Sequence, residues 1–292
     1  MKPLRLAGWL WAAPAALLVL GLVGWPMLYL VRLSLCEGGG QSGFGLGGSF
    51  YTPGTWTLHG YQVLIGDRYF WEIWGFTLWL GFVVTGLCIL LGYPTAHMLW
   101  QLPRRWKGLA LACVIIPKVS NLLVTAYGLK LILEDHGPVD EAFVALHLVR
   151  EPLPLQHSAT GVVIGETLLV LPYTILMIWA GLERLDRQLL AAARGLGASA
   201  WQTFVRITWP LSLPAVGAAV MVSLIWALGA FVSPYLLGSP EQMTLAMDVQ
   251  RQMFENLNWP RGAGEGVAML ATLVIIAGGL TFLRSRLQPS IR

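Results

Sequence analysis

The chain has 292 residues, of which 56% are hydrophobic and only 12% are charged, and its formal net charge is +4. Because soluble domains carry about 25% charged residues, this composition excludes an ordinary soluble protein and indicates a membrane protein. The three cysteines fit no disulfide framework or zinc spacing, and the Lys and Arg distribution described below explains the positive charge without a nucleic-acid partner.

Six apolar segments are long enough to cross a bilayer, which takes about 20 residues per helix. They cover residues 9–33, 71–99, 109–132, 159–181, 212–237 and 264–283. The first exceeds the apolar core of a signal peptide, so we expect it to be retained. Since lipid offers the backbone no hydrogen-bond partner, every segment should be helical. These segments predict an all-α integral membrane protein with six transmembrane helices and one domain over residues 1–292.

The basic residues predict the orientation of these helices. With the N-terminus in the cytoplasm, twelve Lys and Arg residues fall in inside segments and four in outside loops. The twelve are Lys2, Arg5, Arg104, Arg105, Lys107, Arg184, Arg187, Arg194, Arg206, Arg284, Arg286 and Arg292. The four are Arg68, Arg150, Arg251 and Arg261. This asymmetry places both termini in the cytoplasm.

Two ionisable residues lie deep inside predicted spans, Lys118 on the third and Glu166 on the fourth. A charge at the bilayer centre costs about 2.5 to 3.5 kcal/mol, so such residues usually face a cavity or each other. At 1.5 Å per residue their depths differ by about 6 Å, which makes an ion pair feasible. Two interpretations remain open, a structural ion pair and a polar translocation path. That path would also include Ser120, Asn121, Thr125 and Tyr127.

Residues 185–210, between the fourth and fifth spans, are predicted to form two short helices joined by a sharp turn. Asp186 can cap the first helix, and Gly197 can end it in the left-handed conformation. Ser199 can begin the second, with Gln202 completing a capping box. Pro210 is expected to close this unit just before the fifth span.

The small side chains of Ala191, Ala192 and Ala193 would allow a partner protein to approach this elbow closely, although an ordinary amphipathic connector would show the same pattern. The sequence contains no phosphate-binding loop, zinc helix or nucleophile elbow. We therefore expect no enzymatic activity, no cofactor and no metal site, and any ATP that drives the protein should bind to another subunit.

The elbow resembles the cytoplasmic EAA loop of binding-protein-dependent ABC importer permeases. That pattern is E-A-A, three residues, G, nine residues, then I-x-L-P. Matches at the right spacing are Ala192, Ala193, Gly197, Ile207 and Pro210, whereas Ala191 and Trp209 replace the glutamate and the leucine. Together with Ala191 and Ser199, these matches define an ATPase-coupling loop over residues 183–210. The replacement at Ala191 removes any contact that the glutamate would make with the ATPase.

The resemblance covers nearly the whole chain and is strongest to the spermidine/putrescine permease branch. The similar stretches are residues 56–61, 90–96, 151–155, 160–164 and 257–260. It implies the MetI-like fold of type I ABC importers, in the bacterial inner membrane. Such importers combine two permease subunits, two cytoplasmic ATPases and an external solute-binding protein. In the branch resembled, the second permease is usually a different chain.

The predicted function is that of a permease subunit for polyamines or a related small solute. The binding protein is expected to dock on residues 36–68 and 238–262, and the elbow on the ATPase. Related branches transport 2-aminoethylphosphonate, opines, thiamine, sulfate and ferric iron, so the solute stays open. The alternative is a self-contained secondary transporter that uses Lys118 and Glu166 as a coupling pair.

Overall fold

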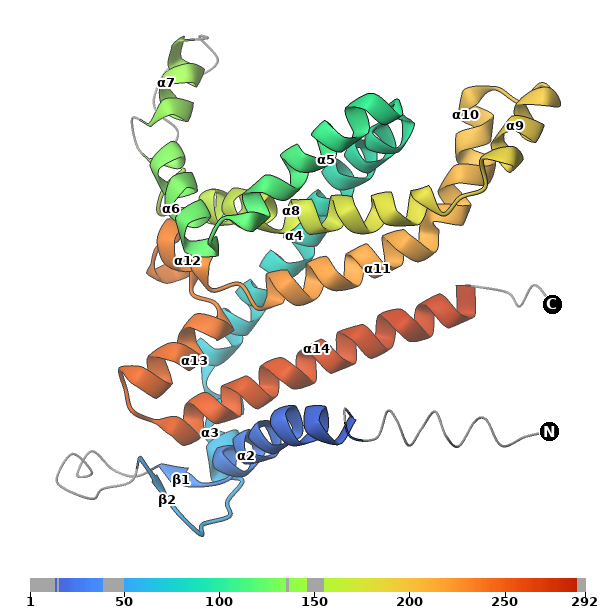
Figure 1. The fold of residues 1–292 in the computed structure, drawn as a ribbon. Helices are drawn as coiled ribbons and strands as arrows, with labels where there is room; N and C mark the ends of the chain where they lie inside the picture. The colour runs from blue at the N-terminus through green and yellow to red at the C-terminus, as the bar shows by residue number, and fades with distance from the viewer. Residues whose placement is uncertain (1–13, 15, 39–49, 135–136, 146–154, 288–292) are drawn as a thin grey trace, which may run out of the picture. The chain divides into compact units, whose positions relative to one another are not determined.

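The computed structural model describes residues 14, 16–38, 50–134, 137–145 and 155–287 (Figure 1). Residues 9–13 of the first predicted span, residues 39–49 of the predicted docking loop and both termini lie outside this range. The described chain divides into two compact units, residues 1–71 with 245–274 and residues 72–244 with 275–292. The prediction of one domain over residues 1–292 stays a prediction.

The described elements are almost all helical, which confirms the all-α fold. The helices are α2 (Trp25–Ser34), α3 (His59–Gly66), α4 (Arg68–Gln101), α5 (Arg104–Val119), α6 (Leu122–Leu133), α7 (Pro138–Ala145), α8 (Ala159–Glu183), α9 (Arg187–Gly195), α10 (Ala200–Thr203), α11 (Trp209–Leu228), α12 (Val232–Leu237), α13 (Leu245–Phe254) and α14 (Trp259–Leu287). Two π-helical turns, Leu20–Gly24 and Phe204–Thr208, precede α2 and α11, and a 3-10 turn spans Pro240–Gln242. The strands β1 (Glu37–Gly38) and β2 (Tyr51–Thr52) pair antiparallel.

Within the described residues, five helices are long and apolar enough to cross a membrane. They are Ala16–Ser34, Arg68–Gln101, Ala159–Glu183, Ala200–Leu228 and Trp259–Phe282. A sixth span results if α5 and the helix after it, which meet at 99°, count as one broken span. The six-span prediction therefore agrees with the structure only with a sharp break in the third span.

The third predicted span, residues 109–132, is not one continuous helix. The backbone is extended at Ser120 and Asn121, with ψ angles of 150° and 136°, and this break separates α5 from α6. The Asn121 Oδ1 atom accepts a hydrogen bond from the Leu123 backbone N–H at 2.9 Å and so caps α6. Pro117, one turn earlier, further weakens the helix because it lacks a backbone donor.

The fifth predicted span, residues 212–237, is also displaced. Its helix begins before residue 212 and ends at Leu228, and a break at residues 229–231 leads into α12. Pro210 does not close the elbow as the sequence predicted, because α10, the π-helical turn and α11 form one uninterrupted helix over Ala200–Leu228. Pro210 lies inside this continuous helix, directly after the π-helical turn, and such a local π-helical adjustment accommodates the backbone group that the missing proline N–H leaves free.

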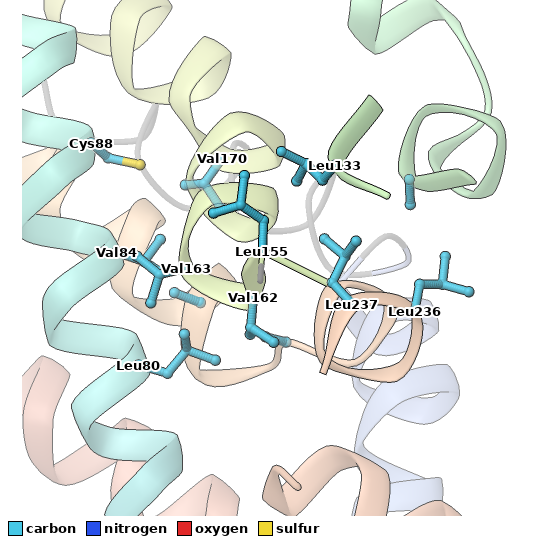
Figure 2. Close-up of a cluster of buried hydrophobic side chains, with 13 residues drawn as sticks. Leu80, Val84, Cys88, Leu133, Leu155, Val162, Val163, Val170, Leu236 and Leu237 are labelled. Carbon is cyan, nitrogen blue, oxygen red and sulfur yellow. The ribbon is translucent and has the colours of Figure 1, made fainter. Parts of the chain in front are cut away.

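The core of the unit containing residues 72–244 surrounds α8. In the most apolar stretch of this helix, 67% of the residues are buried. Helices α8 and α11 run side by side (Figure 1), and α4, α8 and α12 share a cluster of buried Leu and Val side chains (Figure 2). Glycines allow this close packing. A Cβ atom on Gly165 would lie 2.3 Å from Leu237, and one on Gly181 would lie 2.1 Å from the Ala215 Cβ.

The other unit contains α2, both strands, α3, α13 and the first part of α14. Here an ion pair joins α14 to the end of α3, since Arg261 contacts the Asp67 carboxylate at 2.5 Å. Two further pairs lie within single helices, Arg261 with Glu265 at 3.2 Å on α14 and Arg251 with Asp248 at 2.6 Å on α13. Glu265 and Asp248 are buried, and buried carboxylates need such partners to remain inside a protein.

Candidate functional site

The elbow between α8 and α11 has the local structure that the sequence predicted. The Asp186 side chain accepts a hydrogen bond from the Gln188 N–H at 2.8 Å and caps α9. At the other end Gly197 has a φ of +85°. The Gly197 N–H donates to the Arg194 carbonyl at 3.0 Å and the Ala198 N–H to the Ala193 carbonyl at 3.1 Å. This is a Schellman motif, which closes the carbonyl end of α9 without help from a partner.

The second half of the elbow begins with the predicted capping box. The Gln202 N–H donates to Ser199 Oγ at 3.2 Å, and the Ser199 N–H donates to Gln202 Oε1 at 2.9 Å. Both short helices are therefore held by hydrogen bonds within the segment itself. The elbow is a preformed unit that continues directly into a transmembrane helix.

The elbow exposes apolar side chains that its sequence pattern did not predict to be exposed. Leu196 is 90% exposed and Trp201 is 72% exposed. Of the predicted coupling residues, Ala191, Ala192, Ser199 and Pro210 are exposed, whereas Ala193 and Ile207 are half-buried. Large apolar side chains that are exposed at the end of a membrane span are typical of a surface that another protein covers. The position of Leu196 and Trp201 beside the predicted turn at Gly197 was the signal in the sequence that could have indicated this exposure.

Lys118 lies at the break between α5 and α6 and contacts α8 and α11. Its Nζ donates to the Leu169 carbonyl and lies 4.5 Å from the centre of the Tyr173 ring and 6.0 Å from that of Trp226. The two rings are 4.9 Å apart. An ammonium group between aromatic faces and a carbonyl oxygen is a favourable arrangement away from water. We call this set, Leu169, Tyr173 and Trp226, the ammonium niche.

The structural ion pair between Lys118 and Glu166 was one of two open interpretations, and no direct salt bridge joins the two side chains, since among the described residues no contact within 4 Å connects them. Glu166 is buried on α8 with 2% exposure. The small cavity beside Lys118, of about 140 Å³, is lined by Ser120 and Thr125 from the predicted path but not by Glu166. Asn121 caps α6, and Tyr127 is 52% exposed on that helix. The structure thus brings together only part of the predicted path.

Hydrogen bonds cross the break itself. The Thr125 hydroxyl lies 3.5 Å from the Pro117 carbonyl and 3.2 Å from that of Asn121. A broken helix at membrane depth frees backbone groups, and these must find partners in side chains or in a water-filled cavity. Thr125 supplies one such partner, and the cavity beside Lys118 provides space for water.

Glu265 is a buried ionisable residue that sequence reasoning missed, although it lies inside the sixth predicted span. It is fully buried and contacts Arg261 one turn earlier on α14. The spacing of four residues between the two opposite charges was the available signal. Arg261 also reaches Asp67, and its hydrogen bond holds the pKa of the Asp67 carboxyl below its usual value. Throughout the part of the chain that the structure describes, no group of three His, Cys, Asp or Glu side chains could hold a metal ion.

Comparison with known proteins gives consistent matches over most of the chain. The family described as "Binding-protein-dependent transport system inner membrane component" matches residues 88–291. The spermidine/putrescine transport system permease protein PotB of Escherichia coli (strain K12) is 31% identical over 268 residues, which cover 89% of this chain and 93% of that protein. The trehalose transport system permease protein SugA of Mycobacterium tuberculosis is 27% identical over 278 residues, covering 91% of this chain and 84% of that protein.

Solved structures share the fold at low sequence identity. A bacterial ABC transporter involved in the import of the acidic polysaccharide alginate matches with a TM-score of 0.75 and 16% identity, covering 99% of both chains. The MetNI methionine ABC transporter in an inward-facing conformation matches with a TM-score of 0.52 and 18% identity, covering 74% of this chain and 91% of that one. At these identities the likeness concerns the fold alone.

Proposed function

Because the chain belongs to the family of binding-protein-dependent transport system inner membrane components, we propose that its elbow receives the motion of a cytoplasmic ATPase and passes it to the ammonium niche. The chain is a permease subunit of an ABC importer in the inner membrane. The alternative, a self-contained secondary transporter with a Lys118–Glu166 pair, is not supported, since the relatives are importer permeases.

The observation that carries this proposal is the continuous helix from the elbow into the membrane. Ala200–Leu228 contains 29 residues, which at 1.5 Å per residue span about 43 Å, against about 30 Å for the hydrocarbon core. The elbow end therefore extends beyond the hydrocarbon core. Trp226 of the niche lies near the opposite end of the same helix, so a rigid displacement of the elbow reaches it directly.

Hydrogen bonds tie this helix to its neighbours along its length. Ser212 lies 3.0 Å from the Tyr93 hydroxyl on α4, and Ser223 lies 2.7 Å from the Thr174 hydroxyl on α8. Both pairs are buried, and interhelical hydrogen bonds of this kind help to hold membrane helices together. Movement of α11 should therefore also move Tyr173, which lies next to Thr174 and forms the other wall of the niche.

For the partners we propose the type I importer assembly. The elbow contacts an ATP-binding subunit, with Leu196 and Trp201 in the contact. A second permease, a different chain, completes the path, and an external solute-binding protein docks on residues 36–68 and 238–262. ATP binds to the partner subunit. This arrangement requires both termini to lie in the cytoplasm, as the excess of basic residues in the inside segments supports.

The solute class that we propose is the polyamines. PotB relatives carry spermidine and putrescine in their names, and the niche around Lys118 has the chemistry that binds an ammonium group. In this mechanism Lys118 fills the niche between transport cycles, and an ammonium of the solute takes its place when the helices move.

Uptake by the reconstituted importer tests the solute class. Proteoliposomes containing both permeases, the ATPase and the binding protein should take up radiolabelled spermidine or putrescine when ATP is enclosed, and not when a non-hydrolysable analogue replaces it. Unlabelled polyamine should compete, whereas trehalose should not. Uptake of neither polyamine under conditions of binding-protein-stimulated ATP hydrolysis would remove the polyamine assignment and leave the importer role intact.

Reporter fusions test the orientation separately. A reporter fused after Arg187 should behave as cytoplasmic, and one fused after Asp140 should behave as external, because an odd number of spans separates the two positions. The reverse pattern, or the same side for both, would overturn the proposed topology. The fusions need no knowledge of the solute.

A further inference from the structure

A cavity of about 400 Å³ lies between the elbow and the last turn of α4. The polar and aromatic residues around it include His97, Trp100, Gln101, Arg187, Arg194 and Thr203. This volume is large enough for a phosphate group and several bound waters. The lining contains two arginines and no Asp or Glu side chain, so the cavity attracts anions.

Two residues that line the cavity also carry polar groups that are buried and have no partner. Trp100 is 6% exposed, and its Nε1–H donates to no acceptor. The Gln101 side-chain nitrogen lies 2.7 Å from His97 Nε2. Because an amide nitrogen only donates, Nε2 accepts and the proton of the neutral ring lies on Nδ1. This Nδ1 is buried without a partner as well.

The free groups are therefore all donors. Arg187 and Arg194 supply guanidinium forks, and the Arg187 guanidinium lies 5.7 Å from the centre of the Trp100 ring, which holds it beside the indole. Phosphate oxygens accept bidentate hydrogen bonds from arginine and single ones from indole and imidazole N–H groups. Because the Trp100 and His97 nitrogens have almost no exposed surface, they reach an anion in the cavity only after a rotation of these side chains, whereas Arg187 and Arg194 can donate to it directly. An unpaired buried donor is costly, so such a rotation toward an anion is favoured.

The position of the cavity identifies the source of the anion. Helix α4 contains 34 residues, about 51 Å in length, which exceeds the hydrocarbon core of about 30 Å. Its final turn, with His97, Trp100 and Gln101, is therefore expected at the level of the lipid headgroups. Tryptophan favours this level, and basic pockets between membrane helices at the cytoplasmic side bind anionic headgroups.

We propose that this cavity binds the phosphate of an anionic phospholipid, which connects the end of α4 to the elbow. The headgroup accepts hydrogen bonds from α4 and from α9 at once, so the elbow keeps its angle to the membrane only while the lipid is bound. The inference goes beyond the proposed transport function and does not depend on the solute.

The experiment measures lipid retained by the purified importer. The complex is prepared from vesicles of phosphatidylcholine alone or with about one quarter phosphatidylglycerol, and bound lipid is measured by native mass spectrometry and thermal unfolding. Arg187→Gln with Arg194→Gln should weaken phosphatidylglycerol binding by about tenfold or more, since each arginine near an anionic surface contributes about 1 kcal/mol. Trp100→Phe keeps the ring and removes only the donor, and should weaken binding about fivefold.

The matched control is Arg104→Gln with Arg105→Gln, which removes two exposed charges on α5 that do not line the cavity. It should retain phosphatidylglycerol like the wild type. Equal losses in both double variants would reduce the effect to general surface charge and overturn the site. Displacement of the lipid by millimolar inorganic phosphate would assign the cavity to a soluble anion and overturn the lipid assignment. If the arginine variant fails to assemble, unchanged retention in Trp100→Phe would also count against the proposal.

Discussion

Two sharp bends in the unit of residues 72–244 are built in different ways. The bend at Gly197 uses a left-handed glycine, and the surrounding backbone groups are satisfied inside the elbow by a Schellman motif and a capping box. The bend at Ser120 and Asn121 has no glycine. It depends on one side-chain cap, on Thr125 and on a cavity beside a charged residue.

The different ways in which the two bends are stabilised suit them to different roles. Water can satisfy the free groups of a bend outside the bilayer, so the elbow needs its hydrogen bonds for rigidity rather than for solubility. At membrane depth, irregular backbone persists only where protein or a wet cavity supports it, and transporters place such broken helices at their binding sites. The bend at Gly197, which lies outside the bilayer and which we call the outer bend, therefore suits force transmission. The bend at Ser120 and Asn121, which lies at membrane depth and which we call the inner bend, suits contact with the solute.

Replacing Gly197 should have the largest effect, because it breaks the outer bend. A Cβ in the left-handed conformation costs roughly 1 to 2 kcal/mol, and a β-branched side chain costs more. Since a Cβ at Gly197 would meet no atom of this chain within 4 Å, the cost is conformational. Gly197→Val should reduce either co-purification of the ATPase or the binding-protein-stimulated ATP hydrolysis and uptake, in each case by about tenfold or more. Insertion of the chain into the membrane should be unchanged.

Two matched variants sharpen that test. Gly197→Asn should retain most of the coupling, because asparagine tolerates the left-handed conformation better than valine. Gly195→Ala lies in the last turn of α9, where a Cβ also meets nothing, and should be neutral. If Gly197→Val behaved like Gly195→Ala in assembly, hydrolysis and uptake, the elbow would be a simple connector.

A smaller effect is expected at the inner bend, where Lys118 contacts the niche. Lys118→Met and Tyr173→Leu should interact in a double-mutant cycle by about 1 to 2 kcal/mol in the unfolding free energy of the complex, since a desolvated cation–π contact has about that strength. Lys118→Met with Glu166→Gln should give a smaller interaction, because no direct ion pair joins them. A larger value for the second cycle would restore the ion pair and contradict the niche.

The smallest effects should come from the two caps, which compare the bends directly. Ser199→Ala and Asn121→Ala each remove one N-cap, and such caps contribute about 1 kcal/mol. Asn121→Ala should cost more in thermal unfolding of the complex, because the freed Leu123 N–H at membrane depth has less access to water. Equal losses would mean that water reaches both bends equally, and the inner bend would then lie in an open aqueous path.

The sequence predicted the elbow down to its individual caps because caps are local, joining residues two or three positions apart. Hydropathy located the spans but averaged over the polar pair at residues 120 and 121, so the break was missed. Tyr173 and Trp226 could not be assigned to Lys118 from one sequence, since they lie far away along the chain and their contact depends on how α8 and α11 pack. Glu265 was missed for another reason, because its i,i+4 partner Arg261 falls outside the predicted span.

The π-helical turn at Phe204–Thr208 also sets the direction in which Trp226 points around the helix axis. A residue added to or removed from a helix rotates everything beyond it by about 100° around the axis. Residues 204–208 form the only described π-helical turn between the bend at Gly197 and Trp226. Deleting one of them would turn the Trp226 ring away from Tyr173 while leaving the bend at Gly197, its caps and the hydrophobic length of the span nearly unchanged. The helix therefore fixes both the distance and the rotation about its axis between the bend at Gly197 and the ammonium niche.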